Sequence, residues 1–425
     1  MHFFNRLLEG FLRYRSVLRK ASSLYSMRSD CNFKQRHIQC VKWPGFLVKV
    51  SLVKVSGDPT STPLLHCLDI MARFQILSLI GGGIRGAFIT SYLKELEQKL
   101  GRNIAECFDL IAGASTGGII AAGLARGLSA EQMHDFYVRR GKQVFAIRPP
   151  YKAKGIMRLV YPAANWVFKK RTGSGLDVAF RARFCPHELQ GAFDEAFGDD
   201  TLKSIEHTRL IIPVVNLTKG EPHVFRSRHL PKGIHDQDIR ITDAIVAATA
   251  APTYFPHRQI GENAYVDGAV WASDPSLLAF AEAIRIQQFE NGDEGSQHYE
   301  ANDIHLLSVG TGRSQFSLAP PGADAGLLYW ASRVADVMST SQVQGIHLPL
   351  KFFLGSRYRH VNFKMEEPWA LDAVENIAEL CRVGEEVAAE NFDSIREAFL
   401  QHKRAKFTPL STADGEIILN EFGLD

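Results

Sequence analysis

Two strand–turn–helix patterns near residue 100 constrain the fold more than any other feature of the chain. Apolar runs at residues 74–80 and 108–112 are typical of buried strands, and a glycine-rich turn and a helical pattern follow each run. The turns are residues 81–86 (GGGIRG) and residues 113–117 (GASTG). Buried strands that alternate with helices form a mostly parallel sheet with helices on both faces. We therefore predict an α/β protein, a three-layer α/β/α sandwich around a mostly parallel sheet.

The first glycine turn is predicted to bind an anion. A glycine-rich turn ahead of a helix directs several backbone N–H groups at one point, where the helix dipole also favours negative charge. Arg85 adds a fixed cation with five donors to this loop. A phosphate and the oxyanion of an acyl-transfer intermediate both suit such a loop.

The second turn has the pattern Gly-x-Ser-x-Gly around Ser115. A tight turn between a strand and a helix holds a serine hydroxyl clear of the sheet, where a base and an acyl carbonyl can both reach it. The two turns together indicate acyl transfer, with Ser115 as the nucleophile and the first loop around the oxyanion.

A noncatalytic nucleotide-binding protein of the Rossmann type is the alternative that these motifs allow. Gly81, Gly83 and Gly86 also fit the dinucleotide fingerprint, and Asp109 follows at about the spacing of an acidic ribose ligand. That ligand belongs at the carboxyl end of a strand, whereas Asp109 comes near the start of the run 108–112. The position of Asp109 therefore disfavours the nucleotide-binding hypothesis.

A third pattern supplies a candidate base. Asp267 ends a short strand-like run directly before Gly268, and it can lie near Ser115 if it occupies the carboxyl end of a neighbouring parallel strand. A turn or N-cap role is the plain alternative for an isolated Asp-Gly pair. Residues 249–256 (TAAPTYFP) combine small residues with two prolines, and we expect them to form a rigid turn beside Asp267.

Three histidines, His305, His347 and His360, would allow a Ser-Asp-His triad instead. The chain has 15 histidines, and any one of them is more often a packed or surface residue than a catalytic base. We therefore rank these histidines behind Asp267.

The order of the four motifs resembles the patatin-like phospholipase family over about residues 74–312. The resemblance implies a lipid acyl hydrolase with a Ser-Asp dyad, in which Ser115 is the nucleophile and Asp267 its base. It also implies an oxyanion hole around Gly82, Gly83 and Arg85, with no calcium, other metal or cofactor required for catalysis. The expected reaction is the hydrolysis of acyl esters of membrane glycerophospholipids.

The chain departs from the family pattern in two places. Ile80 stands where a polar residue often precedes the glycines. Residues 267–269 (DGA) and 273–275 (SDP) replace the commoner Asp-Gly-Gly and Asn-Asn-Pro. Asp274 thereby adds a negative charge near the expected site, which leaves the substrate preference open.

Four further segments are similar to the compact bacterial members of the family: residues 210–218, 224–226, 303–312 and 358–362. They resemble in particular the phospholipase effectors of cyclic-oligonucleotide-based antiphage signalling (CBASS), which implies that a cyclic dinucleotide activates lipid hydrolysis. A constitutive lipase without nucleotide control is the alternative. The candidates for binding the activator are basic residues that otherwise read as solvated surface charges: Lys169, Lys170, Arg171, Arg357 and Arg359.

The composition of the 425-residue chain, 45% hydrophobic and 22% charged, is that of an ordinary globular protein. It contains no run of 18 apolar residues, so a lipid-cleaving enzyme would act from the bilayer surface. We expect a cytoplasmic protein peripheral to the inner face of the membrane, with phospholipid and not a nucleic acid polymer as its partner. Six cysteines without metal-ligand spacing predict reduced thiols and no metal site.

The charge is uneven along the chain. Residues 1–70 hold 11 Lys and Arg against 4 Asp and Glu, whereas residues 71–425 hold 38 against 42. We therefore divide the chain into a basic extension over 1–70, expected to be poorly ordered, a phospholipase domain over 71–400 and a tail over 401–425. The extension can be a transit peptide, a tether to anionic lipid or a segment ahead of a translation start at Met71.

Two other regions are interpreted from their patterns. Residues 139–183 interleave aromatic and basic side chains, which suits either a lipid interface or a charged surface over core aromatics, and residues 173–175 (GSG) can hinge a lid. Residues 371–400 carry apolar side chains at spacings of three and four, which predicts a helix with one buried face. That face comprises Leu371, Val374, Ile377, Ala378, Cys381 and Val387.

Overall fold

A computed structural model of the chain describes residues 40–43, 46–49, 73–144, 157–172, 181–231, 235–290, 303–314, 330, 334–366, 369–404 and 407–410. Its contacts divide the chain into two units, Met1–Ile70 and Met71–Asp425. The first unit contains a short antiparallel pair, β1 (Cys40–Trp43) and β2 (Phe46–Lys49), in a segment where the sequence pattern indicated no strand.

The second unit is built around an eight-stranded sheet with the order β11-β9-β3-β4-β5-β8-β7, and β6 pairs with β5. Five strands are parallel: β11 (Tyr358–Val361), β9 (Ile304–Val309), β3 (Phe74–Leu79), β4 (Leu110–Gly113) and β5 (Arg209–Asn216). Three strands run antiparallel to their neighbours: β6 (Glu221–Arg226), β7 (Arg258–Ile260) and β8 (Asn263–Asp267). A two-residue parallel pair joins β10 (Arg313–Ser314) to β12 (Lys364–Met365).

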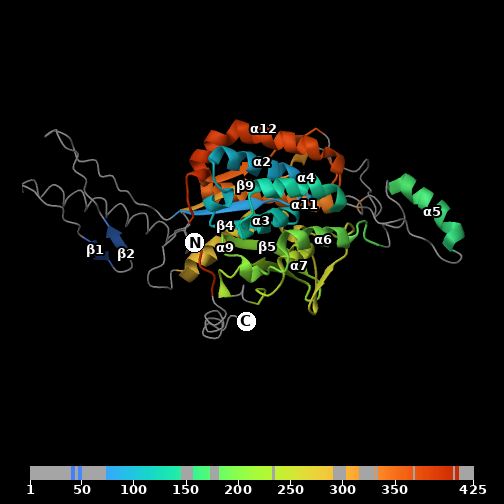
Figure 1. Cartoon of the computed structure of the whole chain (residues 1–425), viewed down its shortest axis with the longest axis horizontal. Coiled ribbons are helices and arrows are strands. Elements are labelled where there is room, and N and C mark those ends of the chain that lie inside the picture. Colours follow the sequence, from blue (N-terminus) through green and yellow to red (C-terminus); the bar gives the residue numbers. More distant parts are fainter. Residues whose placement is uncertain are drawn as a thin grey trace, which may run out of the picture. The chain divides into compact units, whose positions relative to one another are not determined.

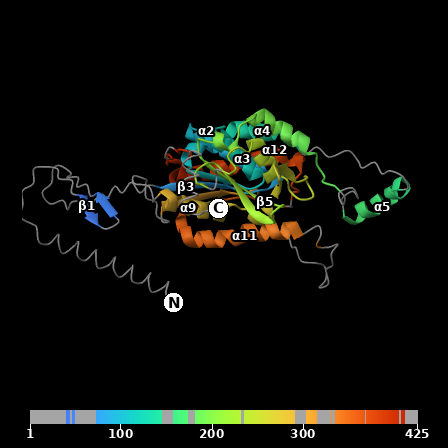
Figure 2. The same cartoon turned by 90° about the horizontal axis from the view of Figure 1, so that it is seen from below.

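Helices cover both faces of the sheet. On one side lie α2 (Gly86–Leu100), α3 (Thr116–Arg126), α4 (Ala130–Val144) and α12 (Ile377–Ile395), and on the other lie α9 (Ser276–Glu290) and α11 (Val334–Leu354) (Figures 1 and 2). Beside them are α6 (Pro186–Phe197), α7 (Ile241–Ala248) and the short α8 (Ala269–Ala272), and α5 spans Met157–Thr172. Short helical turns occur at Gly83–Arg85, Ile104–Cys107, Leu202–Ser204, Gly355–Arg357, Val374–Asn376 and Arg396–Leu400. The predicted three-layer α/β/α sandwich is confirmed.

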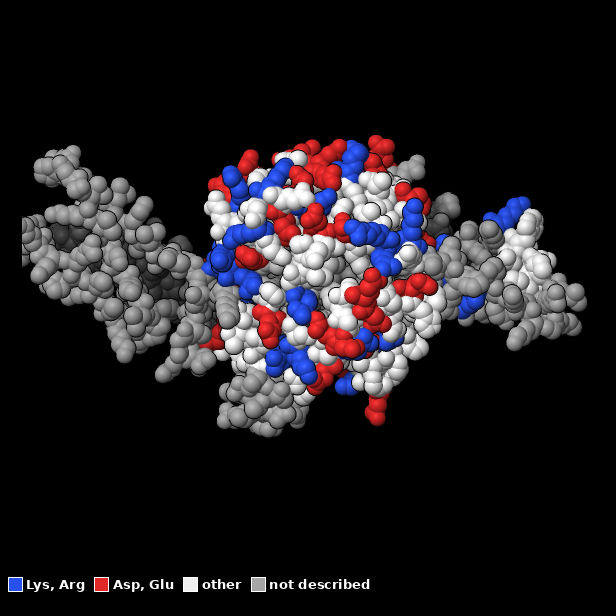
Figure 3. Space-filling view, in the orientation of Figure 1, with Lys and Arg blue, Asp and Glu red and all other residues white. Residues whose placement is uncertain are grey.

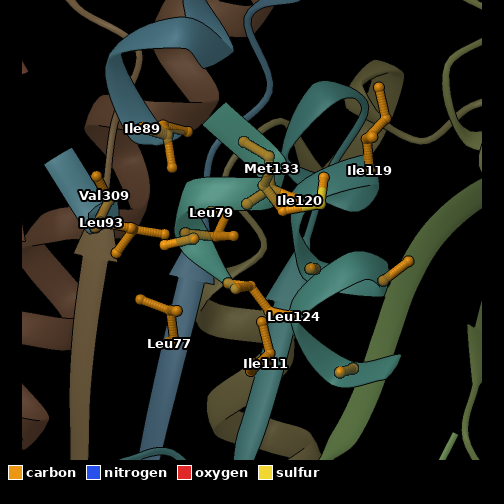
Figure 4. Packing of buried hydrophobic residues seen from close by; sticks show 14 of the residues in the cluster. Leu77, Leu79, Ile89, Leu93, Ile111, Ile119, Ile120, Leu124, Met133 and Val309 are labelled. Atoms are coloured by element: carbon orange, nitrogen blue, oxygen red, sulfur yellow. The ribbon is translucent and has the colours of Figure 1, made fainter. Parts of the chain in front are cut away.

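The core explains why the first two apolar runs form strands. Every side chain of β3 and β4 is buried, as expected for central parallel strands that have a helix layer on each face. Leu77 and Leu79 of β3 pack against Ile120 and Leu124 of α3 (Figure 4). Phe74 and Ile76 belong to the core on the side of α9 and α11. The alternation of the pleat thus divides one apolar strand between two cores.

The helix predicted over residues 371–400 begins later than expected. It runs as α12 from Ile377 to Ile395, after a short turn at Val374–Asn376, and a π-helical turn at Arg396–Leu400 follows it. Ala378 is exposed, contrary to the predicted face. The residues of α12 that are buried are Ile377, Leu380, Gly384, Ala388 and Ile395. Gly384 belongs to this set because a Cβ there would lie 2.8 Å from the carbonyl oxygen of Phe88 in α2, so close packing selects glycine.

Candidate active site

Ser115 lies in a strained turn between β4 and α3. Its backbone has φ 50° and ψ −124°, a conformation that side-chain-bearing residues rarely adopt and that costs of order 1–3 kcal/mol. The turn is tight enough to require glycine after it, because a Cβ on Gly117 would lie 2.2 Å from the carbonyl oxygen of Leu79. The strain and the close packing together hold the Ser115 side chain in one direction, as expected for a nucleophile elbow.

The strand arrangement brings Asp267 to this turn. β4 pairs with residues 209–211 of β5, and β8 pairs with residues 214–216. The other edge of β5 is occupied by β6 over residues 211–216, so β4 and β8 follow one another along the same edge. Because β8 is antiparallel to β5, the carboxyl ends of β4 and β8 face each other. The expectation that Asp267 ends a parallel strand is wrong, but the reversed strand is what brings it close to Ser115.

Asp267 is a buried carboxylate with few partners. Its exposed fraction is 2%, it accepts a 2.8 Å hydrogen bond from the Ala269 N–H, and it shares a side-chain hydrogen bond with Ser115. Burial raises the pKa of Asp267 to about 7, against the lowering effect of these two hydrogen bonds. A carboxylate with this pKa and this contact can accept the Ser115 proton near neutral pH. The predicted rigid turn lies beside it, since the Ala250 carbonyl accepts from the Asp267 N–H.

The glycine loop lies against Ser115 at the carboxyl end of β3. Gly83 has φ +60°, and a Cβ there would lie 2.2 Å from the carbonyl oxygen of Leu371, so a larger residue would also displace the chain that covers the loop. Within the described residues, the N–H groups of Gly82 and Gly83 donate to no acceptor. Donors without partners beside a serine hydroxyl fit an oxyanion hole.

Thr116 is a candidate that the sequence analysis missed. Its N–H is the first of α3 and also donates to no acceptor among the described residues, and its side-chain hydroxyl donates to the Gly83 carbonyl at 2.8 Å. The residue after the nucleophile commonly supplies one oxyanion donor in an elbow. Its position after Ser115 was the available signal.

Arg85 lines the same cavity as Ser115 and the loop. Its Nε donates to the Gly82 carbonyl at 3.2 Å, so the guanidinium group stabilises the conformation of the glycine loop.

A cavity of about 310 Å³ opens over the site. Ser115, Asp267 and residues 81–85 line its polar end. Most other lining side chains are apolar, and they come from several helices and from the turn at 249–256: Ile119, Phe136, Val144, Leu189, Phe193, Pro252, Tyr254, Phe255, Val270, Val334, Met338 and Leu371. A long apolar chamber beside a serine and its base suits an acyl chain.

Asp274 is buried and does not line the cavity, although its neighbour Ser273 does. Its exposed fraction is 1%, and the Ser276 N–H donates to its Oδ1 at 2.9 Å. Burial raises the pKa of Asp274 to about 6, although its hydrogen bonds with Ser276 lower it. His347 Nδ1 is 4.0 Å from the other oxygen of Asp274.

The three histidines do not form a triad with Ser115. The rings of His347 and His360 have centroids 3.9 Å apart, and burial lowers the pKa of both, that of His360 to about 3. His305 contacts Arg73 through Nδ1 at 2.9 Å, near the amino end of β9. None of these residues lines the cavity.

Asp109 lies at the edge of the sheet opposite to the glycine loop. It precedes β4, and its Oδ2 accepts hydrogen bonds from the Gln75 N–H at 2.8 Å and from His402 Nε2 at 3.0 Å. A ribose ligand would have to lie at the carboxyl edge, so this position counts against the nucleotide-binding hypothesis.

Several sequence hypotheses depend on side chains outside the described residues. Lys169 and Arg171 are among them, as are residues 145–156 and the proposed hinge at 173–175. Lys170 is exposed, with its ammonium 5.1 Å from the centroid of the Trp166 ring, and Arg359 is also exposed. Arg357 donates to the Phe353 carbonyl at 3.3 Å. The activator site therefore stays a prediction.

The part of the chain that the structure describes contains no group of three or more His, Cys, Asp or Glu that could hold a metal ion. Cys107, Cys185 and Cys381 are free thiols. Among the described residues, no helix has both the length and the apolarity to cross a bilayer.

Comparison with known proteins identifies the family. Residues 77–280 match the family model described as patatin-like phospholipase. A cGAMP-activated phospholipase of Vibrio cholerae is 34% identical to this chain, over 58% of the chain and 67% of the relative. A second, from Escherichia coli, is 28% identical over 79% of the chain and 87% of the relative, and patatin-like protein 4 of Arabidopsis thaliana is 28% identical over 60% and 64%.

Two solved structures are also similar. VipD from Legionella pneumophila is 11% identical with a TM-score of 0.36, over 88% of this chain and 73% of that one. Human GIVD cytosolic phospholipase A2 is 10% identical with a TM-score of 0.37, over 77% and 60%. At these scores the fold assignment rests on the strand order described above and not on these structures.

Proposed function

The chain belongs to the patatin-like phospholipase family, and we propose that it hydrolyses acyl ester bonds of membrane glycerophospholipids with Ser115 as the nucleophile and Asp267 as the base. The activity of the family is lipid acyl hydrolysis. The roles of the individual residues are our proposal.

One observation carries the assignment of the dyad. Ser115 is held in a strained turn and shares a hydrogen bond with Asp267, whose pKa burial raises to about 7. A buried carboxylate beside a serine hydroxyl can take its proton, whereas a carboxylate with a pKa near 4 would be a much weaker base.

The reaction proceeds in two steps. In the first, Ser115 Oγ bonds to the acyl carbonyl carbon while its proton passes to Asp267, and the bond to the glycerol oxygen then breaks as Asp267 returns the proton to that oxygen. The products are a lysophospholipid and an acyl-serine. In the second, Asp267 takes a proton from water as the water oxygen bonds to the acyl carbon, the bond to Ser115 Oγ breaks, and Asp267 returns the proton to Ser115 Oγ, which releases the fatty acid.

The N–H groups of Gly82, Gly83 and Thr116 stabilise the negative oxygen in both steps. These three groups donate to no acceptor within the described residues, so they need no rearrangement to bind the oxyanion. Arg85 positions the loop through the Gly82 carbonyl and adds positive charge. The apolar end of the cavity accommodates the acyl chain.

We further propose that a cyclic dinucleotide activates the enzyme in antiphage defence. Two relatives are named cGAMP-activated phospholipases. They are 34% and 28% identical to this chain, and the matches span 67% and 87% of their lengths. A ligand activates only as far as it binds the competent state more tightly than the inactive one. The candidate contacts remain Lys169, Lys170, Arg171, Arg357 and Arg359.

Release of fatty acid from phospholipid vesicles tests both proposals in one experiment. The wild type and Ser115→Ala are compared with Ser339→Ala, a matched control whose serine lines the same cavity but bonds to Ser273 and not to the carboxylate. Each protein is assayed without nucleotide and with a panel of cyclic dinucleotides. Fatty acid release that depends on Ser115 but not on Ser339 supports the nucleophile. Full release without any nucleotide, unchanged when nucleotides are added, contradicts activation and leaves a constitutive lipase.

A further inference from the structure

Helix α11 exposes an apolar stripe on the outer surface of the molecule. The exposed fractions are 76% for Leu348 and 82% for Phe352, and Val334 and Met338 are also exposed. Their spacing of four, ten and four residues places all of them on one side of an α-helix. We call these four residues the α11 face. Figure 2 shows α11 along the outer side of the sheet, opposite to α2 and α4.

Few charged residues occur along the α11 face. From Val334 to Leu354 the sequence contains one Asp, Asp336, no Glu, and one Lys or Arg, Lys351. The other long outer helix, α12, has a charged surface, with Glu379, Arg382 and Glu386 exposed. Acidic and basic groups lie side by side along the top of the molecule in Figure 3, where α12 runs. Large exposed apolar surfaces are uncommon on soluble proteins and mark a contact with a partner or a membrane.

The α11 face continues into the cavity that contains Ser115. Val334 and Met338, at its amino end, line this cavity, and so does Val270, which is also exposed. At the other end, Phe353 stacks on Phe280 of α9 with ring centroids 6.3 Å apart, which anchors the helix to the body. The α11 face thus has one pair of apolar residues at the cavity and a second pair at Leu348 and Phe352, with the small exposed residues Ser341 and Gly345 between the two pairs.

We propose that the α11 face docks on a phospholipid bilayer, so that the cavity opens onto the membrane. The inference rests on the proposed function, because the substrate of a phospholipase lies in the bilayer and must reach Ser115 through the mouth of the cavity. A lipid leaving the membrane along the α11 face meets apolar or small side chains. Insertion of Leu348 and Phe352 among the acyl chains removes their apolar area from water, and Lys351 faces anionic headgroups.

The test compares a double variant on the α11 face with a single-charge control in the opposite helix layer. Leu348→Glu with Phe352→Glu alters two residues that lie outside the cavity. The matched control carries Val138→Glu on α4, an exposed apolar residue in the opposite helix layer, with an exposed fraction of 45%. Binding to vesicles of phosphatidylethanolamine and phosphatidylglycerol is measured by co-sedimentation, with and without cGAMP. Hydrolysis of the vesicles is compared with hydrolysis of a soluble short-chain ester.

The double variant is expected to bind vesicles on the order of tenfold more weakly or worse, and to hydrolyse them correspondingly more slowly. Its rate on the soluble ester and its melting temperature should equal those of the wild type, and Val138→Glu should change none of these quantities. The uncharged double variant Leu348→Gln with Phe352→Gln should lose binding to the same extent. It serves as a second test in case the two glutamates of the first variant disturb folding.

Two results would overturn the inference. One is vesicle binding by both double variants at the wild-type level. The other is a wild-type dimer that the double variants convert to monomer while vesicle binding is kept, because a second copy then occupies the face. The proposed function fails separately, if the wild type binds vesicles through this face but cleaves neither lipid nor soluble ester.

Discussion

Two carboxylates of this protein are equally buried, each with an exposed fraction of 2%, but their surroundings are opposite in kind. Among the described residues, Asp267, at the end of β8, contacts two neutral donors, the Ser115 hydroxyl and the Ala269 N–H. Glu282, in α9, contacts Arg226 at 2.6 Å, His229 at 3.1 Å and Arg285 at 3.1 Å.

The pKa values diverge for this reason. Burial raises the pKa of Asp267 to about 7, and within the described part of the chain no cation is among the causes that lower it. Burial also acts to raise the pKa of Glu282, but hydrogen bonds from His229 and Arg226 and the guanidinium charge outweigh it, and the pKa falls to about 2. Burial lowers the pKa of His229, and Ser227 lies 3.0 Å from its Nδ1, which suits a neutral ring that donates to Glu282 from Nε2.

The partners of the two acids, and not their burial, therefore separate the carboxylate that we propose as the base from the structural one. A buried acid without a cation can act as a base near neutral pH, whereas a buried acid with two arginines stays ionised and cross-links α9 to β6.

The largest effect is expected from the dyad. Ser115→Ala and Asp267→Asn should each lower turnover on the order of 10³-fold or more, because the two groups act as a unit. Both variants should stay folded, since they remove one neutral contact. Steady-state kinetics on a soluble ester and thermal melting measure the two quantities. Wild-type rates for Asp267→Asn, together with loss of activity in His347→Ala, would replace the dyad with a triad.

Glu282→Gln should instead destabilise the fold, by about 3 kcal/mol, because it leaves Arg226 and its neighbours without their counter-charge. Its turnover per folded molecule should equal that of the wild type. Urea unfolding measures the loss, and Arg382→Gln on the exposed surface of α12 is the control that should not shift the melting temperature. A Glu282→Gln protein of normal stability and low activity would place Glu282 in the chemistry and abolish the contrast.

The pH dependence of activity should reflect the raised pKa of Asp267. Activity on a soluble ester should fall about tenfold per unit below pH 7, as Asp267 takes up a proton and loses its function as a base. A rate that stays constant from pH 7 to pH 5 would contradict the raised pKa.

The contributions of Asp267 and Glu282 to stability should depend on pH with opposite signs. The pKa of Asp267 is higher in the folded than in the unfolded chain, so its contribution to stability is present below about pH 4 and is lost as the pH rises to about 7. The pKa of Glu282 is lower in the folded chain, so its contribution is present above about pH 4.5 and is lost as the pH falls to about 2. Urea unfolding of Asp267→Asn and Glu282→Gln across this range should remove one dependence each.

The smallest effect is expected from removal of residues 1–70. Every partner named for either carboxylate lies within residues 71–425, and this part forms its own compact unit. A chain that begins at Met71 should change turnover on the soluble ester less than about twofold. An insoluble or inactive truncation would show that the basic extension belongs to the core of the enzyme.

Local patterns were enough to predict the α/β fold and the motifs that line the cavity. The apolar runs before Gly81 and Gly113 predict buried strands, because only central strands are apolar on both faces, and glycines at the two turns indicate close approach of chain segments. The structure bears this out at Gly83 and Gly117, where an added Cβ would meet backbone at 2.2 Å.

Local patterns were not enough where the answer depended on contacts distant in sequence. Ala378 was assigned to a buried face because its spacing fits, yet the packing of α12 on α2 through Gly384 rotates it into solvent. Asp274 was expected to add a negative charge near the site, but its spacing did not indicate that it would be buried beside Ser276 and His347. Spacing gives periodicity and proximity along the chain, and it does not give the direction in which a neighbouring element packs.

From the sequence alone one could identify the residues proposed to carry the chemistry of this protein: a serine in a glycine-flanked turn, an aspartate before a glycine and a loop of backbone donors. The tertiary structure was needed to show that β8 runs antiparallel along the same edge of β5 as β4, beyond the end of β4, so that Asp267 lies near Ser115. It was also needed to show that Glu282 contacts two arginines, whereas Asp267 contacts no cation among the described residues. Strand direction and the set of neighbours around a buried charge are both fixed by long-range packing, which local residue spacing does not encode.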